Sequence, residues 1–208
     1  MGIKLEKGQG LSDDEFFALM NSAHKRTRHP LYAPTAVTIE TAQRYFEICE
    51  SLSRHVKIGI TLQTRFVIKE NLKAAEAQIF EIENEYRYFS KCLNYALYKK
   101  GSRRAPELNT LLMLPALEGR GFSPYGDKTL HYHVAVGNLP AGLDFIKFRT
   151  LVNGLWRKTN VGKDDVQVAP ANDEWTKYIT KELSCGNVEC IDWANASVPY
   201  EALNIRSQ

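Results

Sequence analysis

Residues 130–136 read Leu130-His131-Tyr132-His133-Val134-Ala135-Val136, an apolar run that carries two histidines two positions apart. Lys128-Thr129 precede this run and Gly137-Asn138 follow it, so its length and boundaries are typical of a β-strand. Side chains two apart in a strand point to the same face. We therefore expect both imidazoles on one face of a sheet and a core on the other, built from Leu130, Tyr132, Val134 and Val136.

Two imidazoles that project together can bind one divalent ion. The alternative is one core histidine and one solvated histidine, because short motifs often match by chance. Glu118 ends the apolar run before the histidine strand, and a hairpin between the two runs would bring its carboxylate to the pair. Taken alone, Glu118 is better explained as a solvated glutamate at a strand end. Two imidazoles, a carboxylate and waters suit Mn²⁺ or Mg²⁺, and Zn²⁺ also fits.

The composition is that of a globular protein. The chain has 208 residues, of which 44% are hydrophobic and 25% charged, and its net charge of +3 permits nucleic-acid binding through a local patch without requiring it. No apolar run is long enough to span a bilayer, and the polar start does not resemble a signal peptide. Cys185 and Cys190 without a second close pair make a poor zinc motif. We expect reduced cysteines, a cytoplasmic location and no membrane partner.

The hydrophobic pattern predicts strands and helices in the order β-α-β-β-α-β-α. The strands are expected at residues 56–64, 109–118, 130–136 and 166–168, and the helices at 68–98, 143–156 and from the capping segment 170–173 to about 183. Residues 188–198 could supply a final strand. This order indicates an α+β fold, an antiparallel central sheet with flanking helices of the ferredoxin-like or RRM-like kind.

Residues 1–54 precede this order as an N-terminal helical extension, and residues 55–208 form the main domain. A capping box at residues 12–15 predicts a first helix that ends in the basic run 24–30, and a second helix covers about 38–54. Lys25, Arg26 and Arg28 fit either a solvated helix end or phosphate contacts, and we favour the contacts. The extension would bind DNA or support dimerisation.

Tyr178 and Lys181 lie three residues apart on the flank of the last predicted helix. The buried face of that helix is predicted to hold Trp175, Ile179 and Leu183. A tyrosine beside a lysine is a plausible nucleophile, because the cation favours the phenolate and can neutralise a transferring phosphate. In isolation, an interfacial tyrosine next to a surface lysine is the commoner case.

Taken together, these motifs resemble those of the HUH endonucleases, and among them the single-tyrosine rolling-circle replication initiator (Rep) proteins. The family's first motif looks like residues 58–64, its second like His131-Tyr132-His133 with Glu118 as acidic ligand, and its third like Tyr178-Ile179-Thr180-Lys181. The order agrees over residues 55–183. The helix at 68–98 is longer than a compact member needs, and residues 1–54 match no motif of the family. No Walker A motif occurs, so such an initiator would need a host helicase and a host polymerase.

The resemblance implies that His131, His133 and Glu118 hold a divalent metal ion, Mn²⁺ or Mg²⁺, and that Tyr178 attacks a phosphate of single-stranded origin DNA. The products would be a 5′-phosphotyrosine link and a free 3′-hydroxyl that can later reseal the strand. Lys181 would position Tyr178 or shield the developing charge, and Glu182 could join the metal site. DNA would run along cations and aromatic rings. The candidates are Arg103, Arg104, Arg120, Arg157 and Lys158, with Phe122 and Tyr125 for base stacking.

Three other functions stay open. A transposase or relaxase uses the same chemistry for DNA mobilisation, although Lys181 and the central histidine pair favour a Rep protein over a relaxase. A non-catalytic RRM-like module would bind single strands through aromatic pairs on the two central strands, where this chain carries Thr61, Glu118 and the histidines. A degenerate family member would bind origin DNA without nicking it. The origin sequence and the owner, whether plasmid, phage or virus, do not follow from the sequence.

Overall fold

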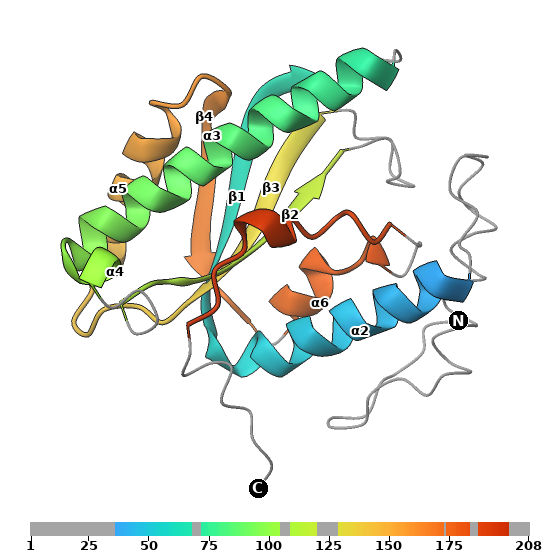
Figure 1. The fold of residues 1–208 in the computed structure, drawn as a ribbon. Helices are drawn as coiled ribbons and strands as arrows, with labels where there is room; N and C mark the ends of the chain where they lie inside the picture. Colours follow the sequence, from blue (N-terminus) through green and yellow to red (C-terminus); the bar gives the residue numbers. More distant parts are fainter. Residues whose placement is uncertain are drawn as a thin grey trace, which may run out of the picture.

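A computed structural model of the chain describes residues 36–67, 72–104, 109–119, 129–172, 174–183 and 187–199. Its centre is an antiparallel four-stranded sheet with the strand order β2-β3-β1-β4 (Figure 1). The strands are β1 (Val56–Val67), β2 (Leu112–Glu118), β3 (Thr129–Gly137) and β4 (Gly162–Pro170). α3 (Leu72–Tyr98) connects β1 to β2, and α5 (Phe145–Trp156) connects β3 to β4. The α+β, ferredoxin-like arrangement predicted from the sequence is confirmed.

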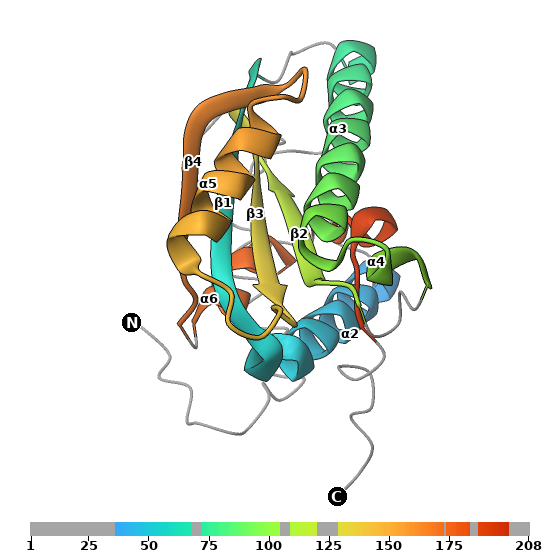
Figure 2. The same ribbon diagram turned by 90° about the vertical axis from the view of Figure 1, so that its left-hand side faces the viewer.

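The first face of the sheet is covered by α3 and α5 (Figure 2). Alternate residues of the strands point into this layer, as the period of two requires. The rings of Phe89 in α3 and Trp156 in α5 meet edge-on there, with centroids 5.5 Å apart. The four residues of β3 predicted to face a core, Leu130, Tyr132, Val134 and Val136, all lie in it and are fully buried.

The second face is covered by α2 (Ala36–Leu52), by the short helix α6 (Trp175–Ile179) and by the segment 187–199. Ala42, Cys49 and Leu52 of α2 pack with strand residues such as Leu114 and Ala135. The sequence pattern predicted a core only on the face opposite the histidines, whereas the structure buries a second apolar cluster on a large part of the histidine face. Residues 36–52 of the predicted N-terminal extension pack on the sheet, whereas residues 1–35, with the predicted first helix, lie outside the described residues. The domain division at residue 54 stays a prediction.

The segment 187–199 lies along the outer edge of β2. It forms two isolated bridges, Ala116 with Ile191 and Met113 with Ser197, on either side of a 3₁₀ turn at Trp193–Asn195, so the expected final strand is not regular. Pro115 has no N–H to donate, and its carbonyl accepts a hydrogen bond from the Asp192 N–H at 2.9 Å. The position without an N–H therefore faces the irregular outer edge of β2, and the hydrogen bonds between β2 and β3 are not affected.

Three further boundaries differ from the predicted ones. β4 is longer than the expected strand at 166–168, and the basic loop after α3 contains the short helix α4 (Gly101–Arg104). α6 begins after Glu174, with no side-chain cap, and ends at Ile179 rather than near residue 183. The Thr180 hydroxyl donates to the Thr176 carbonyl at 2.9 Å, and the chain then tightens into turns in which the Leu183 N–H donates to the Thr180 carbonyl. Within the described residues, no helix is long and apolar enough to cross a membrane.

Candidate metal centre and nucleophile

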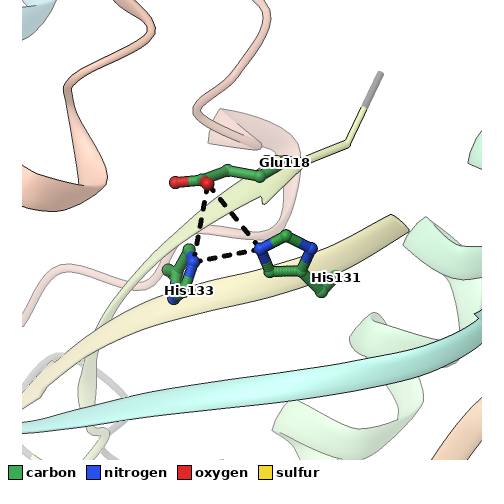
Figure 3. A group of neighbouring side chains, drawn as sticks. All are labelled: Glu118, His131 and His133. Carbon is green, nitrogen blue, oxygen red and sulfur yellow. Dashed lines mark hydrogen bonds and ion pairs between the residues drawn. The ribbon is translucent and has the colours of Figure 1, made fainter. Parts of the chain in front are cut away.

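Two neighbouring strands bring two imidazoles and a carboxylate together. In the β2–β3 ladder Glu118 pairs with His131, and the next residue on that face of β3 is His133. The Nε2 atoms of the histidines are 3.1 Å apart, and Glu118 Oε2 lies 3.7 Å from the first and 3.5 Å from the second (Figure 3). One ligand atom from each residue lies within 4.8 Å of the others. This buried group could bind a metal ion.

Each imidazole is held through its other ring nitrogen. His131 Nδ1 lies 2.9 Å from the Thr129 carbonyl oxygen, which can only accept, so Nδ1 carries the hydrogen and Nε2 presents its lone pair. His133 Nδ1 lies 3.0 Å from the hydroxyl of Thr61, its partner in the β1–β3 ladder. Histidines that bind metals are commonly oriented in this way. The sequence placed Thr61 on this face but gave no sign of its role, because the register between two strands 72 residues apart is not contained in the pattern.

The donor set fits a cation. Two imidazole nitrogens 3.1 Å apart repel each other when both present lone pairs, unless a proton or a metal ion lies between them. Glu118 Oε1 is buried and has no hydrogen-bond partner among the described residues. The three side chains belong to residues that are only 3–6% exposed. A divalent ion would satisfy the carboxylate and both imidazoles at once.

Lys181 connects this group to Tyr178. Its Nζ lies 2.7 Å from Glu118 Oε2 and 3.8 Å from the centroid of the Tyr178 ring. Burial would raise the pKa of Glu118, but the neighbouring imidazoles of His131 and His133 and the Lys181 ammonium outweigh it and hold that pKa well below its usual range. Burial lowers the pKa of Lys181, and the Glu118 carboxylate more than reverses this, so the net shift is upward. Both groups are therefore charged at neutral pH.

Burial lowers the pKa of His133 despite the neighbouring Glu118. A lowered pKa keeps this imidazole neutral at physiological pH, and the neutral form is the one that binds a metal. The electrostatics of the pocket therefore agree with the ligand geometry.

The Tyr178 hydroxyl points at the histidines. Its oxygen lies 3.4 Å from His133 Nε2, and its ring meets that imidazole edge-on with centroids 4.9 Å apart. The Trp175 ring stacks on the tyrosine with centroids 5.5 Å apart, meets the His133 ring edge-on at 5.9 Å and lies against β1 at Gly59. A Cβ on Gly59 would lie 2.5 Å from the indole, so the glycine allows α6 to approach the sheet closely enough for Tyr178 to reach His133. Tyr178 remains 43% exposed and thus accessible to a substrate.

A pocket of about 330 Å³ opens beside the tyrosine. It lies over β1 and β4, on the part of the second face that α2 leaves uncovered. Its walls combine polar and aromatic groups, namely Gly59, Thr61, Gln63, His131, His133, Gln167, Ala169, Trp175 and Tyr178. The pocket therefore gives an approach from solvent to both histidines and to the tyrosine hydroxyl. Gln63 and Gln167 were not predicted as site residues, and their meeting depends on the β1–β4 pairing.

The structure does not bring Glu182 into the ligand group. Its carboxylate accepts a hydrogen bond from Asn187 Nδ2 at 2.7 Å. The early end of α6 is the local cause, because the chain leaves the helical path before residue 182.

The predicted DNA-contacting cations do not gather around the site in the described residues. Arg104 is exposed in α4, which precedes β2 in the chain. Glu118 is the last residue of β2, and the strand is roughly 20 Å long. Arg157 pairs with Asp164 at 2.7 Å on the surface, and Lys158 is exposed after α5. Lys25, Arg26, Arg28, Arg120, Phe122, Tyr125 and the side chain of Arg103 lie outside the described residues. DNA contacts by these residues stay predictions.

No protein-family model, curated protein or solved structure matches this chain. Its function is therefore inferred from the residues of its own site.

Proposed function

We propose that this protein is a metal-dependent DNA nickase and strand transferase that initiates rolling-circle replication, with Tyr178 as its nucleophile. The main support is the distance of 3.4 Å between the Tyr178 hydroxyl oxygen and His133 Nε2. These residues are 45 positions apart, and the fold brings a phenol to a group of potential metal ligands. A nucleophile next to a cation site is what transesterification of a phosphodiester requires.

The metal we propose is Mn²⁺ or Mg²⁺. His131, His133 and Glu118 supply two nitrogens and one or two oxygens, which leaves coordination positions for water and for phosphate oxygens. When bound, such an ion would act as a Lewis acid toward the scissile phosphate and orient it.

The residues of the chain carry the covalent step. Tyr178 Oη forms a bond to phosphorus while the bond between phosphorus and the 3′-oxygen breaks, the phenol loses its proton, and the departing 3′-oxygen gains one. One phosphoester bond replaces another, so a 3′-hydroxyl can reverse the step and reseal the strand. Lys181 remains protonated beside the ring, favours the phenolate and offsets charge on the phosphate. Trp175 holds the tyrosine ring by stacking on it.

A purely binding module explains less of this site. Single-strand binding needs exposed rings and cations, whereas here a carboxylate and two imidazoles are buried together with an oxygen that lacks a partner among the described residues. Burying such groups without a cation is unfavourable. A transposase or relaxase would use the same site, and replication is preferred because the order of the motifs resembles that of the Rep proteins.

The test is a nicking assay on a pool of random single-stranded DNA with Mn²⁺, or with EDTA as the metal-free control. We expect metal-dependent cuts that leave protein on the new 5′ end, and sequencing of the captured ends would give the site. Tyr178→Phe should lower the cutting rate by ~10³-fold or more, and Tyr95→Phe, on the outer side of α3, should not. Cutting that survives Tyr178→Phe would show that another residue is the nucleophile. Tight DNA binding without any cutting would favour the binding module.

A further inference from the structure

α3 carries three large aromatic side chains on the side turned away from the sheet. Phe80 is 68% exposed, Tyr88 57% and Tyr95 50%, whereas inward-facing residues such as Ile82, Phe89 and Leu93 are fully buried. The 3₁₀ turn Trp193–Asn195 flanks this outer side, where Arg87 Nε donates to Asn195 Oδ1 at 2.8 Å, and the other described helices and strands leave it uncovered (Figures 1 and 2). Grouped exposed rings on a soluble protein commonly mark an interaction surface.

A groove of about 500 Å³ lies next to Tyr95, between α3 and the segment 194–197. On the α3 side it is lined by Arg87, Ser90, Lys91, Asn94 and Tyr95. With 3.6 residues per turn, Arg87, Lys91 and Asn94 fall within about 40° of Phe80 around the helix axis. A protruding ring and a groove thus share one stripe of the helix, with their centres roughly 17 Å apart along it.

The charges in the middle of α3 change sign along the helix. After Lys73 in the first turn, the carboxylates at 76, 81, 83 and 85 precede the cations at 87 and 91, and two more cations, at 99 and 100, directly follow the helix. The helix dipole favours this polarity only within the first and last turns, but here the boundary lies in the middle of the helix. An antiparallel copy of α3 would place its basic half against the acidic half of the first.

We propose that two copies of this chain form a two-fold symmetric dimer through antiparallel α3 helices, with Phe80 of each copy seated in the groove of the other. In an antiparallel pair the same stripe of each helix meets its counterpart, and an axis near residue 87 sets Phe80 opposite residues around 94. The contact is isologous, so it closes at two copies and does not extend into a filament.

This dimer does not depend on the proposed nicking activity. α3 covers the first face of the sheet and the metal-ligand group lies on the second, so the two sites would face away from the symmetry axis and stay open. Three partly exposed rings on each copy cover less than the ~800 Å² per partner of a standard interface. The association is therefore reversible and depends on protein concentration.

The first test is sedimentation velocity on the full chain over a wide concentration range. The wild-type protein should shift from monomer to dimer as concentration rises, and Phe80→Ala should raise the dissociation constant about tenfold or more. Ile146→Ala is the matched control, because Ile146 is 75% exposed but lies on α5. Thermal melting of both variants separates loss of dimer from loss of fold. A protein that stays monomeric throughout, or equal effects of the two variants, would overturn the proposal.

The second test measures the register by disulfide formation under mild oxidation. Arg87→Cys places a thiol on this stripe and near the axis in both copies and should yield a covalent dimer, whereas the two copies of Phe80→Cys lie roughly 20 Å apart and should not. The wild-type chain gives the background from native cysteines such as Cys92. Equal cross-linking of both variants would reject the register. A monomer that loses single-stranded DNA affinity in Phe80→Ala would show that these rings stack on bases.

Discussion

The two faces of the sheet are built by the same strands but differ in composition and role. On the first face, α3 and α5 enclose a continuous apolar core that includes Phe89 and Trp156. The second face is divided, because α2 and α6 bury an apolar half around Leu114 whereas the other half holds the histidine pair and the pocket beside it. Within the nine residues of β3, alternate side chains therefore face either the apolar core of the first face or the histidine site of the second.

The comparison also explains how the buried charged group on the second face is tolerated. The first face contributes the burial of large side chains such as Trp156, Phe89 and Phe148, whose contribution to stability is large. On the second face, ion pairs and hydrogen bonds among Glu118, Lys181 and the histidines only partly offset their loss of hydration. A site that is ready to bind a cation is thus supported by the core on the opposite side of the sheet.

The largest expected effect is on the first face. Phe89→Ala removes a fully buried ring and should lower the free energy of unfolding by about 3–5 kcal/mol, measured by urea denaturation in EDTA. His133→Ala on the second face removes hydrogen bonds around a small polar side chain and should cost about 1 kcal/mol. If both substitutions lowered the free energy of unfolding equally, the inference that the first face supplies most of the stability would be wrong.

A metal ion should stabilise the protein through the second face alone. Mn²⁺ at ~100 times its dissociation constant should add about 2.7 kcal/mol to the free energy of unfolding, seen as a rise in melting temperature that EDTA reverses. His131→Ala should abolish the rise, whereas Asp164→Ala, which removes an exposed carboxylate on β4, should leave it unchanged. A rise that persists in His131→Ala would place the bound ion elsewhere.

The fold and the ligand group could be predicted because both depend on local patterns. Alternation in β1 and β3 and the position of Glu118 before a turn were sufficient to expect an antiparallel sheet with three ligands on one face. Tyr178 and Lys181 lie side by side as their spacing predicted, and they meet this group as the resemblance to the HUH endonucleases implied. Within the ligand group the neighbours belong to two strands that follow each other in the chain and pair, whereas Tyr178 reaches His133 from 45 positions away.

The remaining features depend on contacts between distant segments. The packing of α2 on the histidine face brings residues near 49 into contact with residues near 114 and 183. The hydrophobic periodicity of each segment does not predict contacts between distant segments. The role of Thr61 follows from the β1–β3 register, and the short length of α6 follows from a threonine that bonds to its own helix backbone. Sequence reasoning described the faces of each element but not which elements would cover them.

The last comparison makes one chemical change at two glycines, and the change at Gly154 has the smallest expected effect. Gly154→Ala in α5 adds a methyl group that meets nothing within 4 Å, so it should stabilise the helix by up to about 1 kcal/mol. Gly59→Ala on the second face would place Cβ 2.5 Å from the Trp175 ring, and the shift this forces should cost about 1–3 kcal/mol. Urea denaturation of both variants gives the sign and size of each effect.

Opposite signs would show that the approach of α6 to the sheet is set by a single absent side chain. Because Trp175 stacks on Tyr178, Gly59→Ala should also displace the tyrosine from His133 and lower metal-dependent nicking, whereas its effect on Mn²⁺ stabilisation should be small. Loss of both properties would mean that the histidine group itself had moved. Gly59 would then hold β1 against β3 and would not simply make room for the helix that carries the nucleophile.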